Sequence, residues 1–175
     1  TKVRVFSPNS GHSQNFVDEM KGFSSVPRVL EAVDTAEEAV TDADIICAAT
    51  TSSTPVLHYQ DLKSGVHING VGSFQPSMQE IDSETIKNAL VFVDSRESAL
   101  SETGDLTIPI QEGIICKNHL RAEIGELLEN PSLGRKTPDE ITFFKSCGVA
   151  VQDVVAAGMA LEQAKKHNLG RIIRM

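Results

Sequence analysis

The amino-acid sequence predicts an α/β fold built on a doubly wound parallel sheet of the Rossmann-like or flavodoxin-like kind. Short apolar runs alternate with stretches of helical periodicity along the 175 residues, which is the order that βα units produce. The clearest run, at 44–50, is apolar on both faces, as is typical of a strand covered by helices on both sides. The runs end in small, polar or glycine residues, and ligands of such sheets bind beyond those ends.

The first part of the chain is expected to contain two short strands and two helices. Phe16, Val17 and Met20 share one face of the first helix. Thr35 is a favourable N-cap for the second helix, with Glu38 in the capping-box position. The expected strands are 3–6 and 29–32, and the expected helices are 13–20 and 36–40.

The remainder of the chain continues the alternation and ends in a long helix rich in valine and alanine. Asn130 and Pro131 close one helical stretch, and Leu169 and Gly170 end the last one. The expected strands are 44–50, 66–72, 89–94 and 141–145, and the expected helices are 120–129 and 148–168. Residues 82–88 and 97–101 are expected to form short helices or turns. Without a repeat or a long linker, residues 1–175 are expected to form one domain.

Composition excludes several function classes. The net charge of −8 argues against a nucleic-acid surface, which needs clustered Lys and Arg. No apolar run reaches the ~20 residues that span a bilayer. The chain has an odd number of cysteines without CxxC spacing, namely Cys47, Cys116 and Cys147. Its histidines do not show the spacing of metal ligands. We therefore expect no disulfide framework, no metal site and a reducing, cytoplasmic location.

Four polar or glycine-containing segments follow expected strands. A plain turn explains one such segment equally well, but four at the same edge of a parallel sheet favour a binding site. A GxGxxG motif is absent, so periodicity alone does not choose between Rossmann-like and flavodoxin-like folds. The four segments are Ser7–Ser10, Ala49–Thr54, Asn69–Ser73 and Lys145–Gly148.

Five stretches of the chain resemble the ornithine cyclodeaminase/mu-crystallin family. They follow one another in the family's order and cover nearly the whole chain. The resemblance implies an NAD(P)-dependent oxidoreductase with a Rossmann-like domain. The stretches are Ala43–Ser52 (ADIICAATTS), His67–Ser73 (HINGVGS), Val93–Leu100 (VDSRESAL), Gly104–Leu106 (GDL) and Asp139–Asp153 (DEITFFKSCGVAVQD).

The family's fold explains the missing glycine motif. In its members an N-terminal segment builds most of a substrate and dimerisation domain, and the first Rossmann strand with its Gly-rich turn follows. The resemblance implies that this chain starts at the second strand, as a piece of a longer protein, and lacks the first strand and that turn. The absent strand is central in the order 3-2-1-4-5-6, so a slot is expected in the sheet. We expect 148–175 to pack back towards the missing domain, and a homodimer to form through that domain.

The resemblance also assigns cofactor contacts. Ser7, Asn9 and Ser10 occupy the place of the ribose-binding carboxylate of NAD enzymes, which favours NADP, with NAD as the alternative. The other assigned groups lie after later strands. They are Ala49, Thr50 and Thr51 for the ribose and pyrophosphate, Asn69, Val71 and Gly72 for the nicotinamide ribose, and Ser146 and Gly148 for the nicotinamide.

The substrate side departs from the cyclodeaminase pattern. Members that cyclise ornithine carry an Asp where this chain has Phe74 and a Lys where it has Met78. Phe74 neither transfers protons nor binds an amine. The Ser73-Phe74-Gln75-Pro76 pattern resembles that of cyclic imino acid reductases, which implies reduction of a C=N bond in a compound such as Δ1-pyrroline-2-carboxylate. The alternatives are ornithine cyclodeaminase, alanine dehydrogenase and a non-catalytic crystallin-like protein that binds NADP and a small ligand.

No proton donor is identified, so the catalytic residues stay unassigned. The remaining polar residues have structural interpretations. Asp94, Arg96 and Glu97 are expected to form a local ion pair or cap, and Glu123 and Glu126 a solvated helix face. Asp153, beside three valines, is expected to need a hydrogen-bond partner, and Cys147 to serve packing.

Overall fold

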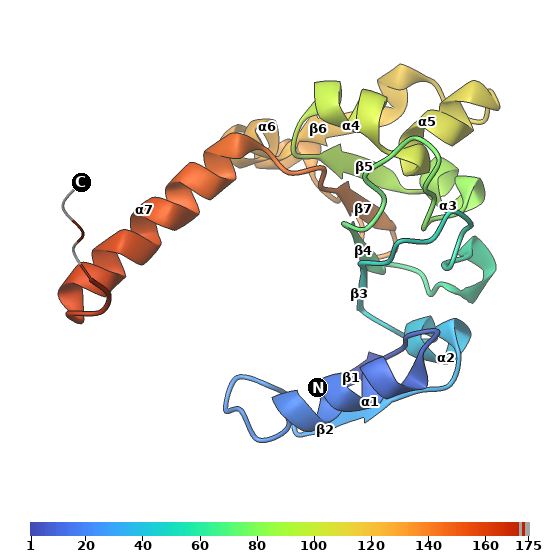
Figure 1. Ribbon diagram of the computed structural model, residues 1–175. Coiled ribbons are helices and arrows are strands. Elements are labelled where there is room, and N and C mark those ends of the chain that lie inside the picture. The colour runs from blue at the N-terminus through green and yellow to red at the C-terminus, as the bar shows by residue number, and fades with distance from the viewer. Residues whose placement is uncertain (172, 174–175) are drawn as a thin grey trace.

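The computed structural model describes residues 1–171 and 173, and its strands form two parallel sheets. The larger sheet has five strands in the order β3-β4-β7-β5-β6, and the smaller pairs β1 with β2 (Figure 1). The parallel α/β fold is thereby confirmed. The strands are β1 Lys2–Val5, β2 Val29–Ala32, β3 Ile45–Ala48, β4 His67–Gly70, β5 Leu90–Val93, β6 Leu120–Glu123 and β7 Thr142–Lys145.

Most helices begin at a short polar side chain that accepts a backbone N–H, as helix N-termini require. Asn9, Thr35, Asp82, Ser95 and Thr103 play this part. The helices are α1 Ser10–Met20, α2 Ala36–Val40, α3 Ser83–Asn88, α4 Arg96–Glu102, α5 Gly104–Gln111, α6 Ile124–Glu129 and α7 Ala150–Lys166, with 3-10 turns at Tyr59–Asp61, Lys117–His119 and Pro131–Leu133.

The hydrophobic core lies between the five-stranded sheet and helices α3, α4 and α5. Ile68, Val91 and Phe143, from three neighbouring strands, are fully buried, and Ile86 and Leu106 cover them from α3 and α5. Burying large aliphatic and aromatic side chains of this kind contributes about 1.5–3 kcal/mol each. The core therefore holds the carboxyl ends of β4, β5 and β7 in one rigid row.

In the part of the chain that the structure describes, strands β1 and β3 each have one unpaired edge. Within the described residues β1 pairs only with β2, and β3 pairs only with β4 (Figure 1). Ile45 and Cys47 on β3 are also exposed, although the strand is apolar on both faces. This separation agrees with the slot expected in the sheet.

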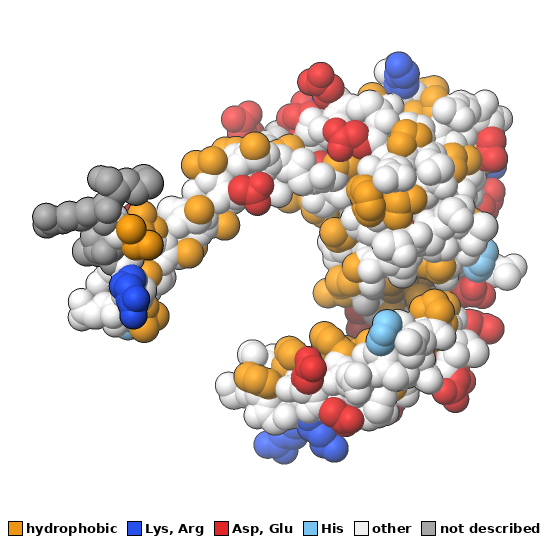
Figure 2. Space-filling model, in the orientation of Figure 1, with side chains coloured by type: hydrophobic (Ala, Val, Ile, Leu, Met, Phe, Trp, Pro, Cys, Tyr) orange, Lys and Arg blue, Asp and Glu red, His pale blue; other side chains and the backbone are white. Residues whose placement is uncertain are grey.

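Helix α7 extends away from the sheet and buries none of its side chains in the described structure (Figure 1). Val151, Val154, Val155, Met159 and Leu161 are all exposed along it. Figure 2 shows the resulting hollow between α7, the five-stranded sheet and the small sheet, with hydrophobic side chains on its walls. The long C-terminal helix is confirmed, whereas its packing stays a prediction, and residues 172, 174 and 175 of the predicted 148–175 unit lie outside the described residues. None of the described helices is long and apolar enough to cross a bilayer.

Three sequence-based expectations are corrected. The helix expected at 120–129 begins only at Ile124, because Leu120 and Ala122 alternate with exposed or half-exposed neighbours in strand β6. Glu123 is not on a helix face but caps α6, and its carboxylate accepts the Arg96 N–H at 2.7 Å. Helix α5, which contains Pro109, was not expected at all.

Candidate functional site

The strand register brings three of the four predicted segments together at the carboxyl edge of the large sheet. Ala48, Gly70 and Lys145 lie side by side on β3, β4 and β7. Backbone bonds continue just beyond them, from Val71 N to the Ala48 oxygen at 2.9 Å and from Ser146 N to the Gly70 oxygen at 3.1 Å. The loops after β3, β4 and β7 therefore form one continuous wall.

The fourth segment, Ser7–Ser10, follows β1 and so belongs to the smaller sheet. Its side chains organise their own turn. Asn9 Oδ1 accepts the Gly11 N–H at 3.0 Å as the cap of α1, and Ser7 Oγ accepts the Asn9 N–H at 3.3 Å. The first turn of α1 carries no acidic residue. An anionic group at this helix end would therefore meet no opposing carboxylate on that turn.

The residues after β3 and β4 differ in what they present to solvent. Ala49, Thr51 and Val71 are exposed, whereas Thr50 is half-buried and its hydroxyl accepts the Ser52 N–H at 3.2 Å. Asn69 points to a sheet face, where its amide oxygen lies 3.3 Å from His67 Nε2. The exposed groups are the ones available to a bound molecule.

Ser73 and Phe74 lie next to each other but in different environments. The Ser73 hydroxyl is fully buried, donates to the Met78 carbonyl at 2.6 Å and lies 2.8 Å from Thr103 Oγ1. Phe74, in contrast, is 54% exposed. The predicted substrate-side role of Ser73 stays untested, but its hydroxyl is already engaged inside the protein, so Phe74 is the side chain open to a ligand.

Asp94 organises the turn between β7 and α7. Its Oδ2 accepts the Ser146 hydroxyl at 2.9 Å and the N–H groups of Cys147 and Gly148 at 2.9 and 2.7 Å. Gly148 has φ +81°, which an L side chain rarely adopts. The prediction of a local role for Asp94 was therefore incomplete, because its carboxylate also binds a turn that is distant in sequence. Arg96 instead pairs with Glu126 at 2.5 Å.

Comparison with known proteins identifies the fold's relatives. The model of the ornithine cyclodeaminase/mu-crystallin family matches residues 1–168. The chain belongs to this family. A Δ1-pyrroline-2-carboxylate reductase of Bacillus cereus is 47% identical over 139 residues, which is 79% of this chain and 42% of the relative. A ketimine reductase mu-crystallin of Macropus fuliginosus is 35% identical over 161 residues, covering 92% of this chain and 46% of the relative.

A solved family member has a closely similar fold. The structure of Thermococcus litoralis Δ1-pyrroline-2-carboxylate reductase in complex with NADH and L-proline superposes with a TM-score of 0.91. It is 36% identical and the match covers 98% of this chain and 53% of that one. This chain thus spans about half the length, or less, of the family members it matches.

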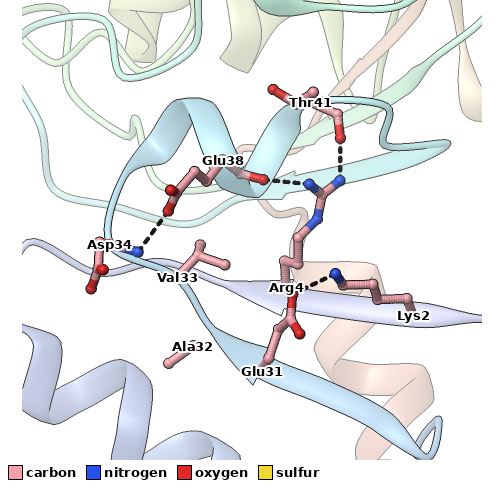
Figure 3. Close-up of a pocket in the computed structure, with 8 residues that line it drawn as sticks. All are labelled: Lys2, Arg4, Glu31, Ala32, Val33, Asp34, Glu38 and Thr41. Carbon is pink, nitrogen blue, oxygen red and sulfur yellow. Dashed lines mark hydrogen bonds and ion pairs between the residues drawn. The ribbon is translucent and has the colours of Figure 1, made fainter.

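A cavity of about 400 Å³ lies away from this family's predicted site residues (Figure 3). Its polar side chains are largely engaged with one another: Lys2 contacts Glu31 at 2.5 Å, and Arg4 donates to the carbonyls of Glu38 and Thr41. None of the predicted cofactor residues lines the cavity. The contacts among its polar side chains instead explain how β1, β2 and α2 hold together.

A buried charge network behind the site was not recognised from the sequence. Glu80, Asp105 and Lys145 are all fully buried, and Asp105 Oδ2 lies 3.3 Å from Lys145 Nζ. Burial raises the pKa of Asp105, and the nearby Lys145 ammonium opposes that rise. Asp105 lies in the family-like Gly-Asp-Leu stretch, which was the only sequence signal for the network.

Cys147 is expected to react slowly with alkylating reagents. Burial raises the pKa of its thiol to about 11, so the reactive thiolate is scarce at neutral pH. Iodoacetamide should therefore modify the exposed Cys116 well before Cys147, and the two rates should converge only as the pH nears that value. Peptide mass spectrometry over a time course measures both sites, and equal rates at neutral pH would contradict the assignment of Cys147 to packing.

Proposed function

We propose that this chain forms the nucleotide-binding part of an NAD(P)H-dependent reductase that acts on the C=N bond of a small cyclic imino acid of the Δ1-pyrroline-2-carboxylate kind. The observation that carries the proposal is the exposed Phe74 beside the wall made by the loops after β3, β4 and β7. An apolar ring there suits a pyrroline and offers no group for binding a distal amine. The similarity to the reductase solved with NADH and L-proline supports the same substrate class.

The residues present fit a nicotinamide dinucleotide, which supplies the hydride when bound. The exposed groups after β3 and β4 would lie along its ribose and pyrophosphate. Ser146 would lie at the nicotinamide, and its hydroxyl proton is directed to Asp94, so the Oγ lone pairs remain free to accept from a carboxamide N–H. Asp94 thus orients Ser146 as an acceptor.

We further propose NADP(H) as the preferred cofactor, with NAD(H) as the alternative. The turn Ser7–Ser10 offers hydroxyl and amide groups at the N-terminus of α1 and no carboxylate, an arrangement suited to a 2′-phosphate. Asn9 Oδ1 is used as the helix cap, so its amide Nδ2, which lies 3.3 Å from His12 Nε2, is the part left to contact a ligand.

The remainder of the active protein is proposed to complete both the sheet and the site. The unpaired edges of β1 and β3 suit one additional parallel strand, and the exposed apolar side chains of α7 suit a packed partner domain. That domain would supply the groups that bind the substrate carboxylate and deliver the proton, as well as a homodimer interface. A cytoplasmic location is in keeping with three free cysteines.

The activity test uses the full-length protein. We expect NADPH, and more weakly NADH, to be oxidised in the presence of Δ1-pyrroline-2-carboxylate, with no ammonia released from ornithine plus NAD. Phe74→Ala should raise KM for the imine roughly 10-fold or more, because an apolar contact of this size is worth about 1.5–3 kcal/mol.

Tyr59→Ala is the matched control, because Tyr59 is an exposed aromatic residue outside the site. Its kinetics should equal those of the wild type. Ammonia release from ornithine would show that Phe74 does not exclude cyclodeamination. Dinucleotide binding without turnover of any imine would favour the crystallin-like role.

A further inference from the structure

The carboxylate of Glu80 lies between the ends of β3 and β4, behind the wall of the proposed cofactor site. It accepts the backbone N–H of Thr50 through one oxygen and the N–H of Ser73 through the other, the latter at 3.0 Å. The side chain is fully buried. One side chain thus fixes the backbone of two loops that belong to different strands.

We propose that Glu80 is a positioning residue for the dinucleotide, which sets the spacing of the loops after β3 and β4 and acts on cofactor affinity without touching the cofactor. The proposal rests on the proposed function, since it assumes that these loops bind the dinucleotide.

Only a carboxylate satisfies both loops. Each of its oxygens faces one N–H donor, and bonds to an ionised acceptor are about twice as strong as neutral ones. In a glutamine one of the two positions would carry an NH2 group, which would then face a backbone donor. The loop held by the missing bond would lose its fixed place and leave a buried N–H without a partner.

A second carboxylate holds Glu80 itself in place. Asp105 Oδ1 accepts the backbone N–H of Glu80 at 2.7 Å and that of Ile81 at 3.1 Å. Asp105 Oδ2 lies 3.3 Å from the Nζ of Lys145, the last residue of β7. Lys145 is followed directly by Ser146, the proposed nicotinamide contact. The network therefore connects the loops after β3, β4 and β7 through side chains that solvent does not reach.

This arrangement predicts a separation of kinetic effects. Loosening the loops weakens the contacts that both of them make with the dinucleotide, whereas the imine meets a single residue of these loops, Phe74, which follows Ser73. A variant of Glu80 should therefore raise KM and Kd for the cofactor by a larger factor than KM for the imine, and leave kcat at saturating cofactor near its wild-type value.

The experiment compares Glu80→Gln with Glu84→Gln in the full-length protein. Glu84 lies on α3, is exposed and contacts Lys87 at 3.8 Å, so it matches the charge change outside the network. NADPH fluorescence should show cofactor Kd raised roughly 10- to 100-fold in Glu80→Gln, the range expected for losing one bond to a charged acceptor. Glu84→Gln should bind like the wild type.

Amide hydrogen exchange provides a readout that does not depend on the cofactor. The N–H groups of Thr50 and Ser73 should exchange faster in Glu80→Gln, whereas the N–H of Thr85, which is held by Asp82 at 2.9 Å, should not change. General loosening of the fold would accelerate all three.

A folded Glu80→Gln with unchanged cofactor Kd and unchanged exchange would overturn the inference. If the wild type itself bound no dinucleotide, the proposed function would fail and the inference with it. If Glu80→Gln did not fold, Glu80→Asp would decide, because it keeps the charge but is one methylene shorter. Weakened cofactor binding at unchanged kcat is then expected, and wild-type affinity would refute the positioning role.

Discussion

Replacing Lys145 with methionine is expected to lower the free energy of unfolding by about 3–5 kcal/mol, the cost of removing one partner of a buried ion pair. Neither Lys145 nor Asp105 is accessible to solvent, and 3.3 Å separates their charged atoms. Methionine fills a similar volume, so the loss comes from the uncompensated Asp105 carboxylate. Urea denaturation of the full-length protein at neutral pH measures the difference.

The same variant should show a distinct pH dependence. Burial already raises the pKa of Asp105, and removing the Lys145 charge removes the main effect that opposes this rise. A carboxyl group with a raised pKa in the folded state binds protons more tightly there than in the unfolded chain. The folded variant therefore tolerates the neutral carboxyl group at low pH. Its free energy of unfolding falls as the pH rises above about 4, the pKa of an aspartate in the unfolded chain. The deficit of Lys145→Met should thus be smallest in acid.

The double variant Lys145→Met with Asp105→Asn separates charge from packing. An asparagine oxygen can still accept the N–H groups of Glu80 and Ile81, because both bonds go to Oδ1. The double variant should regain most of the lost free energy of unfolding. Its stability should also no longer show the pH dependence of the single variant. Lys87→Met, at an exposed pair with Glu84, should leave stability unchanged. A double variant as unstable as the single one would show that the ion pair is not the cause.

Replacing Gly72 with alanine is expected to destabilise the protein by about 1–3 kcal/mol and to weaken dinucleotide binding. A Cβ at this position would overlap the backbone oxygen and nitrogen of Thr50 and the Oε1 of Glu80. Backbone atoms cannot move aside as the end of a flexible side chain can, so the loops after β3 and β4 would separate. Glycine is thus needed here for contact between the loops inside the protein.

Gly125→Ala is the matched control, because a Cβ there meets no atom within 4 Å and the residue lies in helix α6. Alanine favours helix over glycine by up to about 1 kcal/mol, so stability should stay the same or rise. Thermal unfolding and NADPH titration of both variants test the pair. Gly72→Ala with normal cofactor affinity would separate Gly72 from the proposed site.

The elements that sequence reasoning predicted well are those whose own residues determine them. The strand at 44–50 and the helix at 148–168 carry their pattern locally, and Thr35 caps its helix as expected. The sequence pattern does not predict that β7 lies between β4 and β5, because these neighbours in the sheet are far apart in sequence. The sequence predicts helix in place of strand β6, because the four residues of the strand run directly into α6.

The candidate site shows the same division. The loops after β3, β4 and β7 were predictable because parallel strands place their carboxyl ends at one edge. Glu80 was not, because Gln79, Glu80 and Asp82 make three of four residues polar, which looks like a solvated surface segment, and only the fold shows that Glu80 is buried. Asp94 was expected to act locally, yet besides the neighbouring Ser95 N–H it also accepts bonds from Ser146, Cys147 and Gly148, more than fifty residues away.

The division into two sheets has a consequence for the order in which the protein opens. No strand pairing joins the sheets within the described residues, so until the proposed additional strand pairs with β1 and β3 the smaller sheet can detach while every backbone bond of the larger persists. Units of this kind open at free energies well below that of global unfolding. The proposed dinucleotide would span both units and so would bind only when they are docked. It would stabilise the docked state by an amount that grows with the logarithm of its concentration. The bound cofactor would then hold the turn Ser7–Ser10, and with it the smaller sheet, against the larger one.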